Sequence, residues 1–422
     1  MVGPAESNTR APKAAAPGPA LRTGARVAPA TTAPAGYRVP AILQVVPALV
    51  TGGVERGTAD VSAAIVQAGW RSIVASSGGP MVHEIERAGG LHVTLPLESK
   101  NPFVMRRNVD RLMNLITLHR IDIVHARSRA PAWSAMAAAK KTGRPFVTTF
   151  HGVYNAGNPF KRWYNSVMAR GVRVIAISKF VGEHIVQHYG TAADRVRVIH
   201  RGVDFAMFDP ARVSQPRMIQ LAREWRLPDG VPIVILPGRL TRWKGQLVLI
   251  DALAKLGRRD ICCLLVGSDQ GRHSYRAEIE RRVRQRGLEG VVRMVDHCRD
   301  MPAAYMLADV VVSASTDPEA FGRVVAEAEA MGRPVIAPDH GAAPELVTPG
   351  ETGWLFPPGD PAGLAASLDA ALKLDAEQRA KLASAAIEHV RRHFTREGMC
   401  EATLDVYREV LAEADGRPAA IR

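Results

Sequence analysis

The stretch that decides the fold runs from residue 310 to residue 331 and reads VVVSASTDPEAFGRVVAEAEAM. It begins with a short apolar run over residues 310–314 that is typical of a strand buried on both faces. Gly322 then permits a tight turn before a helical pattern over residues 323–331. A strand that leads through a loop into the start of a helix is the repeating unit of an open α/β sheet.

The same alternation of apolar runs and helical stretches extends to both sides of this unit. Strands are predicted before it at residues 41–46, 72–76, 121–125, 145–150, 173–177, 196–200, 233–236, 262–266 and 291–295, and after it at residues 334–337. A loop-like stretch at residues 202–210 and a helix near residues 217–226 separate two groups of strands. The pattern predicts two successive doubly wound α/β units.

This pattern divides the 422-residue chain into five parts. They are a disordered leader rich in Ala and Pro (1–37), a first Rossmann-like domain (38–205), a linker (206–228), a second Rossmann-like domain (229–395) and a final helix (396–416). No strand follows the final helix, so it could cross back to the first domain.

The composition is that of an ordinary globular protein with an excess of positive charge. Hydrophobic residues make up 47% of the chain, and no run approaches the roughly 18 apolar residues that cross a bilayer. The first 36 residues lack the pattern of a signal peptide, so we expect a cytoplasmic protein. Four cysteines without CxxC spacing indicate buried free thiols. The net charge of +14 attracts phosphates, but no nucleic-acid-binding module accompanies it.

Two carboxylates, Glu319 and Glu327, flank the turn of the opening stretch. We expect Glu319 in the loop and Glu327 about one turn into the helix. The helix start between them exposes the backbone N–H groups of Phe321, Gly322, Arg323 and Val324, which suit a diphosphate. Glu319 then suits a sugar hydroxyl and Glu327 a ribose. A pair of solvated acids stabilised by the helix dipole is the alternative.

Arg239 and Lys244 stand five residues apart, directly after the strand predicted at residues 233–236. A guanidinium fork and an ammonium group beside glycines match the two phosphates of a diphosphate. Neutralising that group is the main electrostatic task when a glycosidic bond to a nucleotide breaks. A solvated basic loop is the alternative, because the chain contains 55 Lys and Arg residues.

Two motifs also follow strands of the first unit. Gly52 and Gly53 open a helix and let the backbone approach a phosphate or a sugar closely, although a tight structural turn is the alternative. They match neither the GxGxxG fingerprint nor a P-loop. His151 lies at the end of the strand at residues 145–150, where it can donate a hydrogen bond to a sugar hydroxyl. Most of the 13 histidines are expected to be structural or merely exposed.

Together these motifs resemble family four of the retaining GT-B glycosyltransferases, the glycosyl transferases of group 1. Further stretches that carry the resemblance are IHRGVD at 199–204, MGRPVIA at 331–337, GAAPE at 341–345 and ETGWLFPPGD at 351–360. It covers about residues 38–410. The resemblance implies a GT-B fold, in which a Rossmann-like acceptor domain and a Rossmann-like nucleotide-sugar domain face each other across a central cleft.

The resemblance also implies roles for the candidate residues. Arg239 and Lys244 would hold the diphosphate, and Glu319 would engage the transferred sugar beside the amides of residues 321–324. Glu327 would bind the nucleotide ribose, and His151 would contact the donor sugar.

The remaining contacts implied by the resemblance concern the acceptor and the nucleotide base. Gly52 and Gly53 would form a loop near the phosphate and the acceptor. The base would lie near Gly267 and the loop at residues 295–300. In that loop Asp296 and Asp300 either read a guanine edge or cap the following helix.

A retaining outcome follows from the resemblance as well. A double displacement needs two carboxylates roughly 5 Å apart, whereas the donor motif offers only Glu319 near the sugar. The family is thought to react on one face of the sugar, with the leaving phosphate helping to deprotonate the acceptor. No Asp-x-Asp motif occurs. We therefore predict no metal and no cofactor, the nucleotide diphosphate sugar being the donor substrate.

Two segments of the first domain, residues 101–107 and 158–170, mix aromatic and basic side chains. They indicate either contact with an anionic inner membrane or, for the second, an amphipathic helix that packs Trp163 and Met168 inward. We expect hexosyl transfer from a UDP- or GDP-sugar to a lipid-linked or envelope glycan, such as lipopolysaccharide core or exopolysaccharide. Transfer to a soluble sugar, sugar phosphate or glucan is one alternative. A non-catalytic nucleic-acid-binding protein is another.

Overall fold

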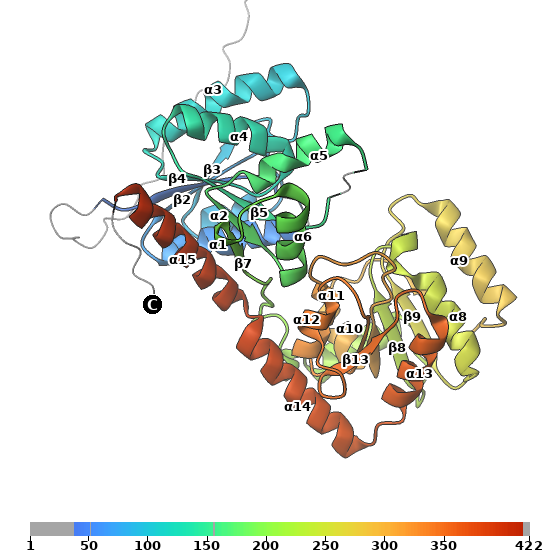
Figure 1. The fold of residues 1–422 in the computed structure, drawn as a ribbon. Helices are drawn as coiled ribbons and strands as arrows, with labels where there is room; N and C mark the ends of the chain where they lie inside the picture. Colours follow the sequence, from blue (N-terminus) through green and yellow to red (C-terminus); the bar gives the residue numbers. More distant parts are fainter. Residues whose placement is uncertain (1–37, 51, 155–156, 417–422) are drawn as a thin grey trace, which may run out of the picture. The chain divides into compact units, whose positions relative to one another are not determined.

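The computed structural model describes residues 38–50, 52–154 and 157–416 (Figure 1). These residues form two parallel β-sheets with helices packed on their faces. Both sheets belong to one unit of continuous packing that begins at Val39. The leader predicted at residues 1–37 and Thr51 of the glycine-rich loop lie outside the described residues.

The first sheet has seven parallel strands in the order β3-β2-β1-β4-β5-β6-β7. The strands are β1 (Ala41–Val45), β2 (Arg71–Ser76), β3 (Leu91–Thr94), β4 (Ile123–Ala126), β5 (Phe146–Phe150), β6 (Arg173–Ala176) and β7 (Val196–Val198). Every residue of β1, β4 and β5 is buried, as expected for central strands covered on both faces. The order reverses between β1 and β4, and ligands of open α/β sheets bind at the carboxyl ends of the strands beside such a reversal.

The second sheet has six parallel strands in the order β10-β9-β8-β11-β12-β13. The strands are β8 (Ile233–Pro237), β9 (Cys262–Val266), β10 (Val292–Val295), β11 (Val310–Val312), β12 (Val335–Pro338) and β13 (Gly353–Phe356). The order reverses between β8 and β11, which are the strands that lead into the Arg239–Lys244 and Glu319 motifs. The topology therefore brings these two motifs to one edge of the sheet.

Helices connect the strands and cover the sheets (Figure 1). The α-helices are α1 (Gly53–Gln67), α2 (Val82–Arg87), α3 (Pro102–Leu118), α4 (Arg129–Lys141), α5 (Pro159–Asn165), α6 (Lys179–Tyr189), α7 (Gln215–Glu224), α8 (Gln246–Leu256), α9 (His273–Gln285), α10 (Met301–Leu307), α11 (Arg323–Ala330), α12 (Ala343–Leu346), α13 (Pro361–Leu372), α14 (Ala376–His393) and α15 (Arg396–Ala414). The 3-10 helices are η1 (Ser166–Ala169), η2 (Ala193–Arg195), η3 (Pro210–Arg212) and η4 (Arg242–Lys244). None of the described helices combines the length and the apolarity needed to cross a bilayer.

The two predicted doubly wound units are confirmed, and every predicted strand exists. Sequence analysis missed two strands, β3 and β13, which lie at the edges of the two sheets. No residue of β3 is buried, so it lacks the apolar run of a central strand. The strand β13 begins at Gly353, where a Cβ atom would collide with the carbonyl oxygen of Val335 on β12. Glycine is therefore required for close packing at a position where it weakens a strand signal.

The four cysteines are buried and free, as the sequence predicts. Cys262 and Cys263 are neighbours on β9, and they belong to different hydrophobic clusters. Successive side chains of a strand point to opposite faces of the sheet, which explains this separation.

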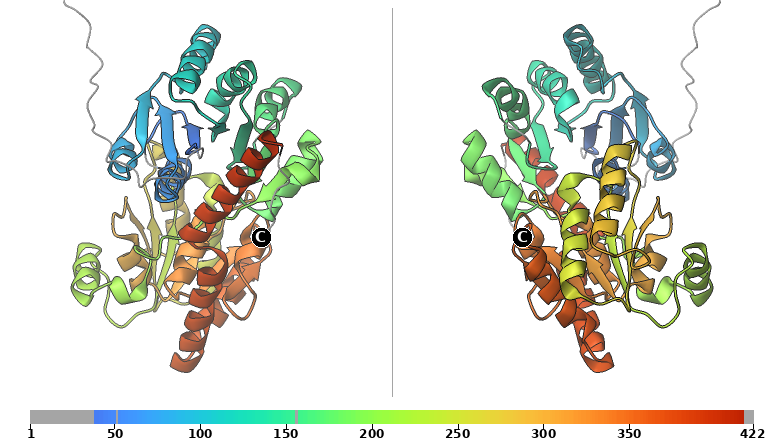
Figure 2. Two further views of the ribbon diagram at one scale, coloured as in Figure 1. Left: turned by 90° about the vertical axis from the view of Figure 1, so that its left-hand side faces the viewer. Right: turned by 90° about the vertical axis from the view of Figure 1, so that its right-hand side faces the viewer.

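The final helix, α15, packs against the first sheet after the chain leaves the second one. Val203 pairs with Thr395, because its N–H group donates to Phe394 O at 2.7 Å and its carbonyl accepts from Arg396 N at 2.9 Å. Leu404 and Tyr407 of α15 share a hydrophobic cluster with residues of α1, β1 and β4. Figure 2 shows α14 and α15 as the successive red helices, with α15 beside the first sheet.

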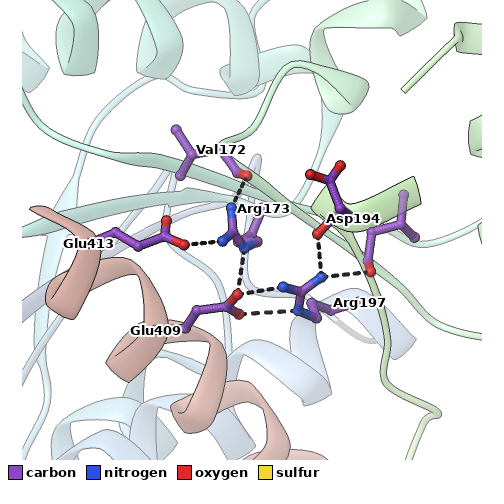
Figure 3. A network of polar contacts seen from close by, with 7 residues as sticks. Val172, Arg173, Asp194, Arg197, Glu409 and Glu413 are labelled. Carbon is purple, nitrogen blue, oxygen red and sulfur yellow. Dashed lines mark hydrogen bonds and ion pairs between the residues drawn. The ribbon is translucent and has the colours of Figure 1, made fainter. Parts of the chain in front are cut away.

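Polar contacts also join α15 to the first sheet. The Glu409 carboxylate accepts from Arg173 Nε at 2.9 Å and from Arg197 Nε at 3.1 Å, and Glu413 also pairs with Arg173 (Figure 3). Arg173 and Arg197 belong to β6 and β7, so carboxylates of the last helix neutralise arginines of two edge-side strands. The last helix of the chain therefore follows the second sheet in sequence but packs against the first sheet.

Candidate functional site

Lys244 and Glu319 form an ion pair at the carboxyl ends of β8 and β11. Lys244 Nζ lies 2.7 Å from Glu319 Oε1, which also accepts from Ser313 Oγ at 3.4 Å and from Ser315 Oγ. Burial raises the pKa of Glu319, but the ammonium and the hydroxyls outweigh it, so the net pKa lies below its usual value. Glu319 is therefore an ionised carboxylate held in one position, 75 residues along the chain from its partner.

Backbone geometry holds both members of this pair. Gly341 has φ +62, and a Cβ atom there would lie 2.6 Å from Glu319 O. The neighbouring Ala342 N–H group donates to the same oxygen at 2.9 Å, which fixes the loop. The aliphatic part of Lys244 lies against Gly238, and its ammonium group is 4.5 Å from the centroid of the Trp243 ring. The loop is thus shaped around the charged pair.

Arg239, predicted to share the diphosphate with Lys244, does not take part in this pair. Its side chain is exposed on the loop between β8 and η4. The two predicted phosphate ligands therefore differ, because Lys244 is bound to a carboxylate and Arg239 faces solvent.

The start of α11 presents open backbone N–H groups, as the sequence predicts. The cap residue Gly322 has φ +95 and offers no side-chain hydrogen bond to the helix. The first helical hydrogen bond found in the described structure runs from Val325 N to Gly322 O at 3.0 Å. The preceding N–H groups, at residues 321–324, remain available to an anion. The Phe321 side chain is buried against His200 and Phe394, which fixes the turn.

Glu327 lies on α11 and accepts a hydrogen bond from Tyr305 Oη at 3.0 Å. Burial raises the pKa of this carboxyl, and Arg323 offsets the effect only in part. Glu319 and Glu327 therefore occupy different electrostatic environments, the first paired with a cation and the second with a neutral hydroxyl. The ribose role of Glu327 stays a prediction.

His151 follows β5 and accepts from an arginine that the sequence analysis did not consider. Arg201 Nη2 donates to Gly53 O at 2.7 Å and lies 3.1 Å from His151 Nδ1. Because a guanidinium is only a donor, His151 Nδ1 must accept and the imidazole proton sits on Nε2. Burial and the nearby Arg201 hold the pKa of His151 well below its usual value. His151 is thus a neutral donor whose buried Nε2 has no partner among the described residues.

Motifs from the two halves of the chain come close to one another. A Cβ atom on Gly53 would lie 3.6 Å from Arg323 Nε, and one on Gly152 would lie 4.0 Å from Ala320 Cβ. The glycine-rich loop therefore reaches the start of α11, and the residue after His151 reaches the residue after Glu319. The segments that carry Gly53, His151, Glu319 and Arg323 therefore form one constellation.

The residues predicted to lie near the nucleotide base have different surroundings. The backbone at Gly267, with φ +154, passes so close to Gly238 O that no side chain fits. Asp300 caps α10 by accepting from Ala303 N at 3.1 Å and pairs with Arg217 at 2.7 Å, which favours the capping interpretation for this residue. Asp296 forms an exposed ion pair with Arg276.

The segment at residues 158–170 differs from the expected single amphipathic helix. It forms α5 and then the 3-10 helix η1. Met168 is fully buried as expected, but the prediction that Trp163 packs inward is wrong, because Trp163 is 50% exposed. Its ring stacks on Trp133 with centroids 4.5 Å apart. The change of helix type after Asn165 alters the direction of the side chains, so a 3.6-residue period does not apply across the whole segment.

Sequence analysis missed several residues that shape this constellation: Arg127, Arg201, Tyr305, Ser313 and Ser315. Arg127 directly follows β4, just as His151 directly follows β5. The strand-end argument that singled out His151 would have found Arg127 as well. The described residues contain no group of three His, Cys, Asp or Glu side chains arranged to hold a metal ion.

Comparison with known proteins places these motifs in a family. The model described as Glycosyltransferase Family 4 matches residues 51–206, and the model described as Glycosyl transferases group 1 matches residues 218–389. A glycosyltransferase from Rickettsia africae is 39% identical, with a TM-score of 0.82 over 89% of this chain and 99% of that one. The chain belongs to glycosyltransferase family 4.

Two further relatives of this family bear on its substrates. The structure of Anabaena HepE in complex with UDP-glucose is 25% identical, with a TM-score of 0.74 over 87% of this chain and 99% of that one. A D-inositol 3-phosphate glycosyltransferase from Corynebacterium efficiens is 33% identical over 55% of both chains. The chain thus spans about half the length of this curated relative, and 64% of a second one with the same name.

Proposed function

We propose that the protein transfers a hexose from a UDP- or GDP-sugar to an acceptor with retention at the anomeric carbon. The observation that carries this proposal is the Lys244–Glu319 pair at 2.7 Å. Its carboxylate, Glu319, lies on the loop that leads into the uncapped helix start at Gly322. A cation and open amides suit a diphosphate, and an ionised carboxylate beside them suits the hydroxyls of the attached sugar. HepE, a structural neighbour, was solved with UDP-glucose.

In the proposed reaction the bond between the anomeric carbon and the diphosphate oxygen breaks. The acceptor oxygen forms the new bond on the same face of the sugar, and its proton passes to the departing phosphate. Lys244, Arg239 and the amides at residues 321–324 stabilise the charge that develops on the leaving group. Glu319 and the Nε2 proton of His151 orient the sugar. We expect EDTA to leave turnover unchanged, since protein cations occupy the role of a metal.

For the acceptor we propose a lipid-linked or envelope glycan, such as lipopolysaccharide core or exopolysaccharide. The support is a pair of exposed aromatic residues on α5, Phe160 at 72% and Trp163 at 50% exposure, together with Phe103 on α3 at 80%. Lys161 and Arg162 stand between Phe160 and Trp163 in the sequence of α5. Aromatic and basic side chains together bind the interface of an anionic membrane. The protein would then work at the cytoplasmic face of the inner membrane.

This membrane contact is testable with vesicles. Replacing Phe160 and Trp163 by serine is expected to abolish co-sedimentation with vesicles of phosphatidylglycerol and phosphatidylethanolamine. Ile219→Ser is the matched control, since Ile219 is 50% exposed on α7. Equal sedimentation of the double variant and the control would contradict the membrane proposal.

A soluble sugar phosphate is the second candidate acceptor. Curated relatives are named D-inositol 3-phosphate glycosyltransferase. A cavity of about 230 Å³ in this chain is lined by Arg129, Phe160, Lys161, Tyr164 and Asn165, and its charged groups are both cations. Transfer to a soluble sugar phosphate in membrane-free extract would favour this acceptor. A nucleic-acid partner would not explain the Lys244–Glu319 pair, and we do not propose one.

The donor class can be tested without knowing the acceptor. A thermal-shift screen against UDP, GDP, ADP and TDP should show one nucleotide that raises the melting temperature. Ligand at a hundred times its Kd contributes about 2.7 kcal/mol to the free energy of unfolding. Absence of any shift with all four nucleotides would contradict the proposed function.

A further inference from the structure

Two buried arginines carry more N–H groups than the described structure satisfies. Arg127 is 3% and Arg201 is 7% exposed. Each guanidinium has five N–H groups. The hydrogen bonds found run from Arg127 Nη1 to Gln44 Oε1 at 3.1 Å and from Arg201 Nη2 to Gly53 and His151. Arg127 Nε is buried without a partner among the described residues.

The charge of these arginines is also unbalanced. Neither forms an ion pair within the part of the chain that the structure describes, although Asp60 and Glu55 are near enough to affect the pKa of Arg201. Burial, reinforced by Arg127, lowers that pKa to about 9. Burial raises the pKa of Asp60 to about 6, and this one carboxyl acts on both Arg127 and Arg201, so it cannot balance both guanidinium charges. A buried guanidinium without a partner is unfavourable, and an anion would relieve the cost.

A glycine inside α1 leaves room for the guanidinium groups of Arg127 and Arg201. Gly57 lies inside α1, where glycine is less favourable than alanine. A Cβ atom at Gly57 would collide with Arg201 Nη1 and would lie 3.2 Å from Arg127 Nη2. The glycine therefore lets both guanidinium groups lie against the first turns of α1. Gly52 and Gly53, at the start of this helix, are partly exposed, so a ligand can reach Arg201 from there.

We propose that Arg127 and Arg201 form a second anion subsite at the start of α1, which takes a phosphoryl group of a substrate. Its residues come from the ends of β4 and β7 in the first sheet, whereas Arg239 and Lys244 follow β8 in the second sheet. The phosphoryl group belongs either to the acceptor or to the nucleotide diphosphate of the donor. Its assignment to the acceptor rests on the proposed function, whereas anion binding itself does not. His151 Nδ1 lies 3.1 Å from Arg201 Nη2, so this subsite adjoins the residue proposed to contact the donor sugar.

The test uses inorganic phosphate and UDP as separate probes, measured by titration calorimetry on the full chain. The variants are Arg201→Gln, Gly57→Ala and, as a control at an exposed arginine away from the site, Arg392→Gln on α14. Gly57→Ala keeps both charges and favours the helix, but its methyl group displaces the Arg201 guanidinium. It therefore separates the loss of a site from the loss of the fold, and melting temperatures check each variant.

We expect Arg201→Gln and Gly57→Ala to weaken phosphate binding at least about tenfold, and Arg392→Gln to weaken it less than about twofold. Unchanged UDP affinity in Arg201→Gln would assign the subsite to the acceptor, and a parallel loss would assign it to the donor. Phosphate binding that is absent in the wild type, or equal to the wild type in folded Arg201→Gln and Gly57→Ala, would overturn the proposal. If no nucleotide bound to the wild type, the proposed donor would be refuted, but binding of inorganic phosphate would still support the anion subsite.

Discussion

The substitution Glu319→Gln is expected to separate nucleotide affinity from turnover. Without ligand, the Lys244 ammonium is held by the Glu319 carboxylate at 2.7 Å, so a diphosphate must compete with this carboxylate for the same cation. Glutamine keeps the size and the hydrogen-bonding oxygen of the side chain and removes its charge. The variant should therefore bind a bare nucleoside diphosphate more tightly than the wild type.

The magnitude follows from the geometry of the pair. A phosphate oxygen hydrogen-bonded to Lys244 Nζ would lie about 5 Å from the Glu319 carboxylate. At an effective dielectric constant of about 20, two unit charges at that distance repel by about 3 kcal/mol. The side chains of Lys244 and Glu319 retain 13% and 20% exposure, and solvent reduces the repulsion to about 2 kcal/mol. UDP affinity should rise about thirtyfold, while turnover falls about a hundredfold because the sugar loses a charged contact.

Titration calorimetry with UDP at low salt measures the first effect, and steady-state kinetics measures the second. Glu327→Gln is the control, since Glu327 contacts Tyr305 and no cation pairs with it in the described structure. It should not tighten UDP binding. Equal or weaker UDP affinity in folded Glu319→Gln would show that the carboxylate does not compete with the diphosphate, and would refute this reasoning.

Three further substitutions test the site and the fold. Lys244→Ala should lower turnover at least about a hundredfold, and near-normal turnover would remove Lys244 from the mechanism. Tyr407→Phe removes the hydroxyl that lies 2.6 Å from His125 Nδ1 and should cost about 1–3 kcal/mol in chemical denaturation; an unchanged midpoint would contradict the role of this contact. Burial raises the pKa of Glu329 well above its usual value. Its contribution to the free energy of unfolding is therefore complete below about pH 4.5, where the carboxyl is protonated in both the folded and the unfolded state. This contribution is lost as the pH rises towards the folded-state pKa. Glu329→Gln should therefore stabilise the protein more at pH 8 than at pH 5, and equal shifts would argue against a buried acid.

The strands could be predicted because burial on both faces leaves continuous apolar runs. This signal fails at two of the four edge strands: β3 is partly exposed, and β13 starts with a glycine required by close backbone contact. The same limit applies to Trp163, which is half exposed and stacks on Trp133 of α4. Tertiary contacts decide such positions, and local sequence patterns do not report them.

The candidate site was predictable in its location but not in its pairings. Strand ends in an open α/β sheet gather at one edge, so Glu319, Lys244 and His151 could be placed by counting from the strands. Sequence analysis placed Lys244 beside Arg239 on a shared diphosphate. In the structure Lys244 pairs with Glu319 instead, because Gly238 and Gly341 set the shapes of the two loops. Arg201 belongs to the IHRGVD stretch, but the sequence does not show that its side chain is buried without an ion-pair partner in the described structure.

The motifs without evident chemistry connect the site residues to one another. Glu345 Oε2 lies 2.7 Å from His200 Nε2 and accepts from Lys179 N at 2.7 Å, while Oε1 accepts from Phe180 N at 2.8 Å. His200 directly precedes Arg201, and Glu345 follows the Gly341 turn that holds the Glu319 loop. One carboxylate therefore links the segment that carries Arg201 to the segment that supports Glu319. The GAAPE and HRGVD stretches are best understood as a structural link through which the two proposed anion sites keep their relative positions.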